Sequence, residues 1–233
     1  MHKNKQDRLH FIIVNCVTGI NLVLGLVSVI AVANDQLTLA AGLLLTCALV
    51  DGLDGPLARR WEVSSDFGAQ FDSLADMTSF IVAGGALAYF WADPADTSIP
   101  VFVAAVAAGA YVLAGAIRLA RYNTVPSRPG YFQGMPTTVV SSIVAITLLT
   151  HKALQGYGVV LLILLLSALM VSVFPYPRLS AFLPRLPRWV YLLALALVLV
   201  SDHRFQIVWL GTLLYLVSGP IISVRYRLAS RSR

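Results

Sequence analysis

The chain has 233 residues, of which 58% are hydrophobic and only 12% are charged, and its formal net charge is +6. The apolar residues come in blocks of about 15 to 23, which predicts an integral membrane protein and excludes an ordinary soluble domain. The basic excess is mainly a membrane-topology signal, and it argues against a nucleic acid partner.

The apolar blocks predict an all-α integral membrane protein, a polytopic helical bundle of about eight transmembrane helices. In chain order the blocks cover residues 11–33, 37–60, 68–91, 100–122, 134–151, 156–174, 188–201 and 205–224. Together they form a single transmembrane domain, residues 11–233. The basic segment 1–10 precedes it on the cytoplasmic side, and its sequence fits either a short interfacial helix or an unstructured tail.

The distribution of basic residues predicts the orientation in the membrane. If both chain ends lie on one side, fifteen of the 17 Lys and Arg residues fall on that side, and only Lys152 and Arg204 fall on the other. Cytoplasmic loops carry an excess of Lys and Arg. We therefore expect both termini in the cytoplasm, and the stretch DGLDGPLARR, residues 51–60, at the cytoplasmic end of the second span.

Four aspartates occupy the second and third predicted spans. Asp51 and Asp54 are three residues apart, and Asp72 and Asp76 are four apart, so each pair shares one helix face. A short connection makes the two spans antiparallel neighbours, which allows the four carboxylates to converge. Because an unpaired acid inside a membrane costs roughly 2.5–3.5 kcal/mol, such a cluster must either take up protons or bind cations.

The ligand chemistry favours cations over protons. An all-oxygen set without His or Cys suits a hard divalent cation such as Mg²⁺, Mn²⁺ or Ca²⁺, and two such ions balance four carboxylates. Paired divalent ions also stabilise substitution at phosphorus. Gly55, Ala58 and Gly68 leave space beside the acids, and Arg59 is placed to hold a phosphate. The alternatives are ordinary helix packing for the small residues and a topology-fixing flank for the arginine.

The combined pattern resembles the complete signature of the CDP-alcohol phosphatidyltransferase family. It reads Asp51-Gly-Leu-Asp54-Gly55-Pro-Leu-Ala58-Arg59 and, after eight residues, Gly68-Ala-Gln-Phe-Asp72-Ser-Leu-Ala-Asp76. Members of this family are integral membrane enzymes, usually homodimers, that displace CMP from a CDP-linked lipid with an alcohol. The resemblance implies their fold, two divalent cations, Mg²⁺ or Mn²⁺, held by the four aspartates, and Asp76 as the general base.

The resemblance also implies a binding site for the CDP-linked lipid. The family's Asn-x-x-Thr element, which approaches the nucleotide, is matched by Asn15-Cys-Val-Thr18, with Cys16 where Pro is usual. The residues implied to bind the CDP-lipid are Thr18, Gly55, Ala58, Arg59, Ser65 and Gly68.

Three features are similar to the phosphatidylserine synthase branch of that family. They are the stretch FDSLADMTSF at 71–80, the stretch RLARYN at 118–123 followed by YFQGMP at 131–136, and Asn21, where relatives that use glycerol phosphate often carry Arg. This similarity implies transfer of a phosphatidyl group from CDP-diacylglycerol to the hydroxyl of L-serine. We also expect the protein in the cytoplasmic membrane of a prokaryote, with the active site facing the cytoplasm.

Acceptor binding is predicted for residues around the fourth span. Arg118 and Arg121 share a helix face and could meet a carboxylate or a phosphate, while Asn123 and Tyr131 could add hydrogen bonds. The alternative is that both arginines only fix topology or contact lipid headgroups.

Two other functions stay open at the level of the sequence. One is the same reaction with another acceptor, such as glycerol-3-phosphate or inositol phosphate, or with an archaeal ether lipid. The other is cation transport through buried aspartates, although a cation pathway has little use for an arginine among its acids.

Overall fold

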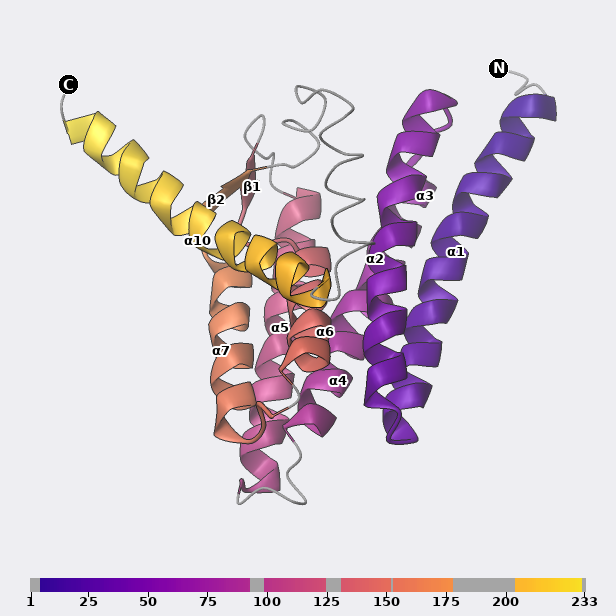
Figure 1. Ribbon diagram of the computed structural model, residues 1–233. Helices are drawn as coiled ribbons and strands as arrows, with labels where there is room; N and C mark the ends of the chain where they lie inside the picture. The colour runs from indigo at the N-terminus through magenta and orange to yellow at the C-terminus, as the bar shows by residue number, and fades with distance from the viewer. Residues whose placement is uncertain (1–4, 93–98, 125–130, 152, 178–203, 232–233) are drawn as a thin grey trace.

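The computed structural model describes residues 5–92, 99–124, 131–151, 153–177 and 204–231 (Figure 1). Four helices there are long and apolar enough to cross a membrane: α1 (Lys5–Ala33), α2 (Leu37–Arg60), the continuous helix Asp66–Trp91 and α5 (Val101–Thr124). Shorter apolar helices are α6 (Thr137–Thr150), α7 (Tyr157–Val171) and the middle of α10 (Arg204–Arg231). The predicted polytopic helical membrane fold is confirmed, whereas the number of spans stays a prediction because the seventh, 188–201, lies outside the described residues.

Helices α1 and α2 form an antiparallel hairpin, which stands at the right of Figure 1. Helix α1 is unbroken from Lys5 onward, so residues 5–10 extend the first span. The two helices approach closely because the contact residues of α2 include the fully buried Ala40 and Ala41. At the same contact, the Ser28 hydroxyl donates a hydrogen bond to the Ala40 carbonyl.

The third long helix consists of α3 (Asp66–Asp76), a π-helical stretch η1 (Met77–Val82) and α4 (Ala83–Trp91). Ser65 caps its start, since the Ser65 hydroxyl accepts a hydrogen bond from the Gly68 N–H. The π-helical stretch begins directly after Asp76. The Ser79 hydroxyl lies 2.7 Å from the Ala75 carbonyl of its own helix and 3.1 Å from the Asn21 carbonyl of α1, and the Tyr111 hydroxyl donates to the Phe80 carbonyl. Such π-helical turns are frequent at functional sites.

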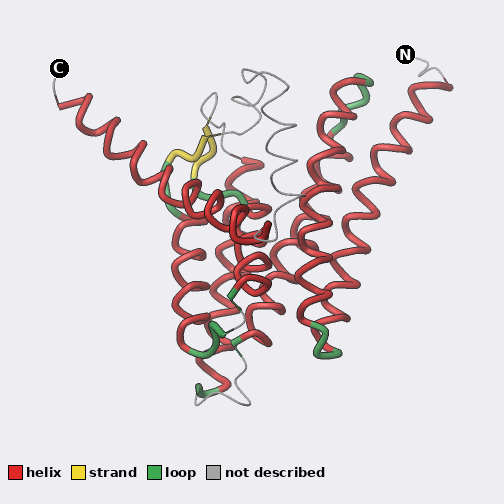
Figure 2. Tube along the Cα trace, in the orientation of Figure 1, coloured by secondary structure: helices red, strands yellow, loops and turns green. Residues whose placement is uncertain are grey.

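The second half of the fold packs α5 against α7 and places a small sheet at one end. The strands β1 (Tyr131–Gln133) and β2 (Pro175–Pro177) pair antiparallel, with Phe132 opposite Tyr176. Helix α10 lies against α6 and β2. In Figure 2 the strands lie at the same end of the molecule as the start of α1 and the end of α10.

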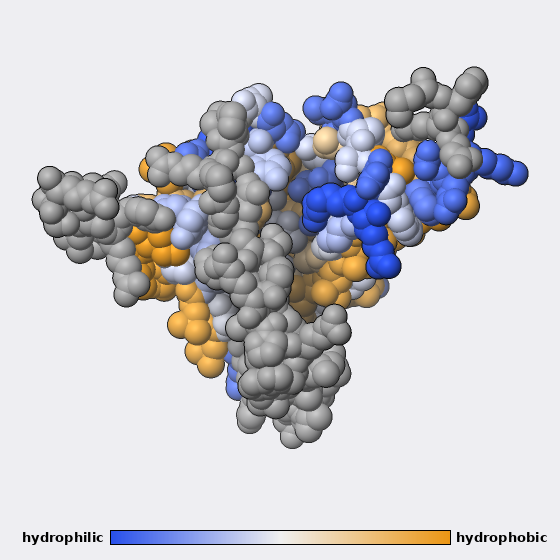
Figure 3. Space-filling view, turned by 90° about the horizontal axis from the view of Figure 1, so that it is seen from above, coloured by the Kyte–Doolittle hydropathy of each residue, from blue (hydrophilic) through white to orange (hydrophobic). Residues whose placement is uncertain are grey.

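Apolar side chains on the outer faces of the bundle suit a lipid environment. Leu49 on α2 is 74% exposed and Phe102 on α5 is 76% exposed, and both helices are long and apolar enough to cross a membrane. In the view onto the end that carries the start of α1, hydrophilic residues gather on the face and hydrophobic residues lie along the flanks (Figure 3). The candidate site is built from the helices that meet below this polar face.

Candidate active site

Three carboxylates from two helices meet in the interior. Asp51 of α2 and Asp72 and Asp76 of α3 each offer an oxygen, and these oxygens lie within 4.8 Å of one another. All three residues are half-buried. Oδ1 of Asp72 and Oδ1 of Asp76 are buried and have no hydrogen-bond partner among the described residues. Because like charges at this spacing repel, the donor set fits a hard divalent cation.

The fourth aspartate, Asp54, lies outside this group of three. Its Oδ2 accepts a hydrogen bond from the Thr18 hydroxyl at 2.8 Å, and its Oδ1 accepts one from the Gly55 N–H at 2.6 Å. Because Asp54 is only 7% exposed, the Thr18 hydroxyl on α1 stabilises a buried carboxylate on α2. The structure therefore brings three of the four predicted ligands together and holds the fourth on the wall of an adjoining pocket.

That pocket has a volume of about 170 Å³ and opens between α1, the end of α2 and the start of α3. It contains Asp54 and Asp72, so it borders directly on the carboxylate cluster. All six residues predicted to bind the CDP-lipid line it. The full lining is Val14, Asn15, Thr18, Asp54, Gly55, Ala58, Arg59, Val63, Ser64, Ser65, Gly68, Ala69 and Asp72.

Two glycines, Gly55 and Gly68, leave room for polar side chains at the wall of this pocket. A Cβ atom added at Gly55 would lie 3.4 Å from Nη1 of Arg59, because the exposed Arg59 side chain folds back along its own helix. A Cβ atom at Gly68 would lie 3.3 Å from the Ser65 hydroxyl oxygen and 3.9 Å from Oδ1 of Asn15. A guanidinium beside two uncharged polar groups is suited to bind a phosphate and its attached nucleoside.

Arg118 is a buried cation close to the carboxylates. It is 6% exposed, it interacts electrostatically with Asp76, and its Nη1 donates a hydrogen bond to the Thr137 hydroxyl at 3.2 Å. Its guanidinium carbon lies 5.9 Å from the ring centres of both Tyr122 and Phe132. A buried arginine held in this way presents a fixed positive charge to the site.

The other three residues predicted to bind the acceptor have protein partners. Nη1 of Arg121 donates to the Val171 carbonyl, and Nη2 donates to the carbonyls of Gln133, Met170 and Ser172. Nδ2 of Asn123 donates to the Ser73 hydroxyl at 3.0 Å, and Tyr131 pairs with Pro177 in the sheet. The structure thus brings Arg118 to the carboxylate cluster, while Arg121 holds main-chain groups at the end of α7.

Thr137 and Thr138 are polar residues of the site that the sequence analysis missed. Thr137 accepts from Arg118, and the Thr138 hydroxyl donates to Oδ2 of Asp51 at 3.5 Å. A usable signal exists, because Pro136 followed by two threonines and an apolar run is typical of a helix start. Only the tertiary contact with Arg118 and Asp51, however, gives these residues a place in the site.

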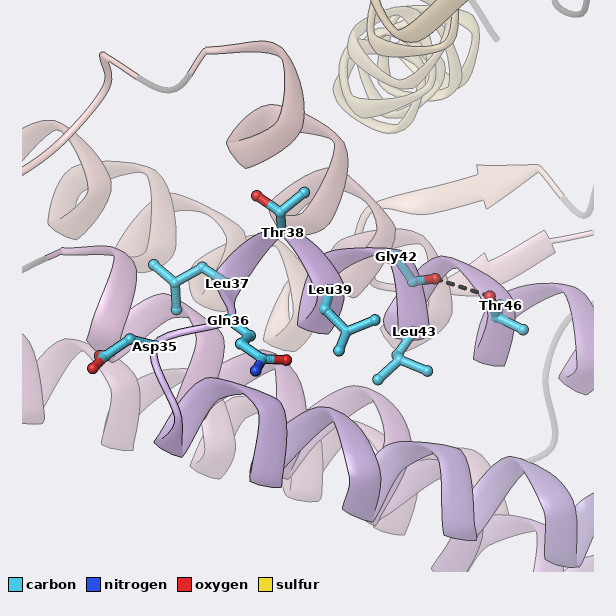
Figure 4. A pocket seen from close by; sticks show the side chains of 8 residues that line it. All are labelled: Asp35, Gln36, Leu37, Thr38, Leu39, Gly42, Leu43 and Thr46. Carbon is cyan, nitrogen blue, oxygen red and sulfur yellow. Dashed lines mark hydrogen bonds between the residues drawn. The ribbon is translucent and has the colours of Figure 1, made fainter.

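A second hollow lies along the half of α2 that precedes the carboxylates. It has a volume of about 720 Å³, and it is lined by eight residues of the α1–α2 turn and the first half of α2 (Figure 4). Thr46 donates to the Gly42 carbonyl there, and Asp35 is the one acidic residue of the lining. This open groove lacks the converging polar groups that mark a binding site for a charged substrate.

Comparisons with known proteins agree with the signature. The family model for CDP-alcohol phosphatidyltransferase matches residues 11–174. A protein of Helicobacter pylori named CDP-diacylglycerol–serine O-phosphatidyltransferase is 35% identical over 216 residues, which cover 89% of each chain. A protein of the same name from Methanocaldococcus jannaschii is 28% identical over 210 residues, 90% of this chain and 92% of its own. An archaetidylserine synthase of Methanothermobacter thermautotrophicus is 30% identical over 159 residues, 66% of this chain and 64% of its own.

Proposed function

Because the chain belongs to the CDP-alcohol phosphatidyltransferase family, we propose that it transfers the phosphatidyl group of CDP-diacylglycerol to the hydroxyl of L-serine, with release of CMP. The family is an enzyme family, so cation transport is no longer a competing function. The observation that carries the proposal is the meeting of Asp51, Asp72 and Asp76 beside a pocket that contains Arg59.

The carboxylates supply the sites for two divalent cations, Mg²⁺ or Mn²⁺, in a family that depends on divalent metals. Asp51, Asp72 and Asp76 hold them from the cluster, and Asp54 adds its carboxylate from the pocket wall. The bound ions supply positive charge to phosphate oxygens on which negative charge develops. Thr18 and the Gly55 N–H keep Asp54 oriented, so the ligand set is largely preorganised.

The pocket between α1, α2 and α3 binds the cytidine diphosphate part of the lipid. Arg59 contacts a phosphate, and the small residues Gly55, Ala58 and Gly68 leave room for it. Thr18 and Ser65 provide hydroxyl groups on the same wall. The acyl chains stay in the bilayer beside the exposed apolar faces of the helices.

Asp76 acts as the general base. Its Oδ1 has no hydrogen-bond partner in the described part of the chain, so it is free to accept the proton of the serine hydroxyl. The serine oxygen then forms a bond to the lipid-side phosphorus, and the bond from that phosphorus to the CMP oxygen breaks. CMP leaves with the electron pair, which yields phosphatidylserine. Arg118 balances charge beside Asp76 and binds the acceptor.

The orientation follows from the charge distribution. We place the protein in the cytoplasmic membrane of a prokaryote, and the bias of fifteen basic residues against two supports an orientation with both termini and the site facing the cytoplasm. A homodimer is the assembly that we expect from the family resemblance.

An acceptor screen tests the function directly. Purified protein in lipid is supplied with CDP-diacylglycerol and with L-serine, glycerol-3-phosphate or an inositol phosphate, and CMP release is measured with Mg²⁺ or Mn²⁺. We expect turnover with L-serine alone. Turnover with another acceptor in place of serine would refute the proposed acceptor. A CDP-linked archaeal ether lipid is included because one relative is named archaetidylserine synthase, and a preference for it would change the donor and keep the acceptor.

A further inference from the structure

The start of α6 presents a positive helix end inside the site. Pro136 precedes the helix and no side chain caps it, so the N–H groups of its first turn lack helical partners. The helix dipole adds partial positive charge at this end. Thr137 and Thr138 occupy the first two positions, and both contact charged groups of the site, Arg118 and Asp51 respectively.

Arg118 gives independent evidence for a ligand at this point. Its side chain is 6% exposed and directed at the first residue of α6 by the hydrogen bond from Nη1 to Thr137. Its Nε is buried and has no hydrogen-bond partner among the described residues. A buried donor on a charged group is costly to leave unpaired, which points to an anionic ligand beside the guanidinium.

This place is next to the general base and outside the nucleotide pocket. The Thr138 hydroxyl is 3.5 Å from Oδ2 of Asp51, and Arg118 interacts electrostatically with Asp76. Neither Arg118 nor the two threonines belong to the lining of the CDP-lipid pocket. An acceptor held here would therefore reach the carboxylate cluster without competing with the nucleotide.

The main chain around the helix start is held rigidly. Arg121 joins the Gln133 carbonyl to three carbonyls at the end of α7, and the Met135 N–H donates to the Leu169 carbonyl at 3.0 Å. Gly134 has φ +74°, and a Cβ atom there would collide with the Met170 carbonyl. A rigid support of this kind favours a preorganised binding site.

We propose that Arg118 and the N–H groups at the start of α6 bind the carboxylate of an amino-acid acceptor, with Thr137 as the residue that positions Arg118. This subsite rests on the proposed function and explains how the enzyme selects an amino acid over an alcohol that lacks a carboxylate. One guanidinium and one helix end match a single negative charge. The Nη atoms of Arg121 do not serve as further donors to the ligand, because they are bound to main-chain carbonyls.

The first test compares acceptors on the unaltered protein. L-serine and L-serinamide share the hydroxyl and the amine and differ in the carboxylate, so CMP release with each isolates that group. We expect kcat/KM for L-serinamide to be lower by about 100-fold or more, because a site built for a polar group rejects the analogue that lacks it. A value for L-serinamide within about tenfold of that for L-serine would overturn the subsite.

The second test removes the contact that positions Arg118. Thr137→Val keeps the shape of the side chain but removes the hydroxyl that accepts the hydrogen bond from Arg118. We therefore expect KM for L-serine to rise about tenfold, with kcat and KM for CDP-diacylglycerol nearly unchanged. Thr137→Ser should restore the native KM. The matched control is Thr147→Val on the same helix, because Thr147 is also buried and also accepts an N–H, from Trp209. Equal increases in both KM values for Thr137→Val would overturn its positioning role.

The two tests separate the subsite from the function. Serine turnover with equal use of L-serinamide refutes the subsite and leaves the function intact. Absence of serine turnover in the unaltered protein refutes the function and the subsite together. If Thr137→Val does not fold, the comparison of L-serine with L-serinamide on the unaltered protein still decides whether the subsite binds the carboxylate.

Discussion

The proposed CDP-lipid pocket and the proposed acceptor subsite border one carboxylate cluster but are built in different ways. The pocket uses residues 14–72, from three helices that follow one another in the chain. The subsite uses the end of α5 and the start of α6, and its support comes from the end of α7 and from the β1–β2 sheet. The first arrangement is local in sequence, whereas the second depends on contacts between distant segments.

The difference separates chemistry from selectivity. The carboxylates and the pocket share α2 and α3, so a change in the pocket also disturbs the carboxylates that we propose as metal ligands. Among the described residues, Thr138 and Arg118 connect the proposed acceptor subsite to the cluster. Selectivity for the acceptor can therefore change while the signature from Asp51 to Asp76 stays the same.

The largest expected effect comes from removal of divalent cations, which acts on both regions through the cluster. We expect chelation to abolish CMP release, because three carboxylates within 4.8 Å repel one another without a cation. Added Mg²⁺ or Mn²⁺ should restore activity. Full turnover by metal-stripped protein would contradict the assignment of the cluster, and direct metal titration by calorimetry provides a readout that is independent of turnover.

Asp76→Asn is expected to reduce kcat by about 10²- to 10⁴-fold, the usual contribution of a general base. Binding of CDP-diacylglycerol should persist, because Asp76 does not belong to the lining of the pocket. The matched control is Asp35→Asn, which alters an acid at the other end of the α1–α2 hairpin. Asn tolerates the positive φ of 59° at that position. Activity of Asp76→Asn equal to that of the control would exclude this base.

The sequence predicted the pocket side more completely than the acceptor side. Helical spacing brings Asp72 and Asp76 to one face, and the third span packs against α2 through η1 and α4, so the signature sufficed to bring the carboxylates of the two spans together. Spacing also placed Arg118 and Arg121 on one face, but it could not tell that Arg121 meets carbonyls from Met170 to Ser172. Such contacts depend on how α5 and α7 pack, and single-sequence patterns do not encode that packing.

Asp54 illustrates the same limit on the pocket side. Its spacing from Asp51 predicts a shared face and a shared ligand role. In the structure the Thr18 hydroxyl takes one of its oxygens and the Gly55 N–H takes the other. The partner on α1 is 36 residues away in the chain, so the spacing on α2 carries no information about it.

Gly134→Ala tests the rigid support of the acceptor subsite. The substitution puts a side chain at positive φ against the Met170 carbonyl, so we expect a loss of about 1–3 kcal/mol of stability. Thermal unfolding in detergent measures it, and KM for L-serine should rise more than KM for CDP-diacylglycerol. Gly42→Ala is the control, because a Cβ atom there meets nothing within 4 Å. Equal melting temperatures for the two variants would contradict the role of Gly134.

Thr18→Val tests the support of the pocket side. Loss of the hydrogen bond to the buried carboxylate of Asp54 should raise KM for CDP-diacylglycerol about tenfold, with little change in KM for L-serine. Ser28→Ala on the same helix is the control, since its hydroxyl bonds to the Ala40 carbonyl away from the site. The opposite pattern, a rise in KM for L-serine alone, would mean that the two regions are not separate.

The smallest effect is expected from Asn123→Ala. This variant decides whether Asn123 belongs to the acceptor subsite or only joins α5 to α3. Nδ2 of Asn123 donates to the Ser73 hydroxyl on an exposed surface, and a neutral hydrogen bond there contributes about 0.5–1.5 kcal/mol. If the contact only joins α5 to α3, Asn123→Ala and Ser73→Ala change KM for L-serine by about threefold or less, and the double variant is no worse than either. If Asn123 binds the acceptor, Asn123→Ala alone raises that KM, because Ser73→Ala leaves the amide free to contact serine. The subsite then extends to the C-terminal end of α5.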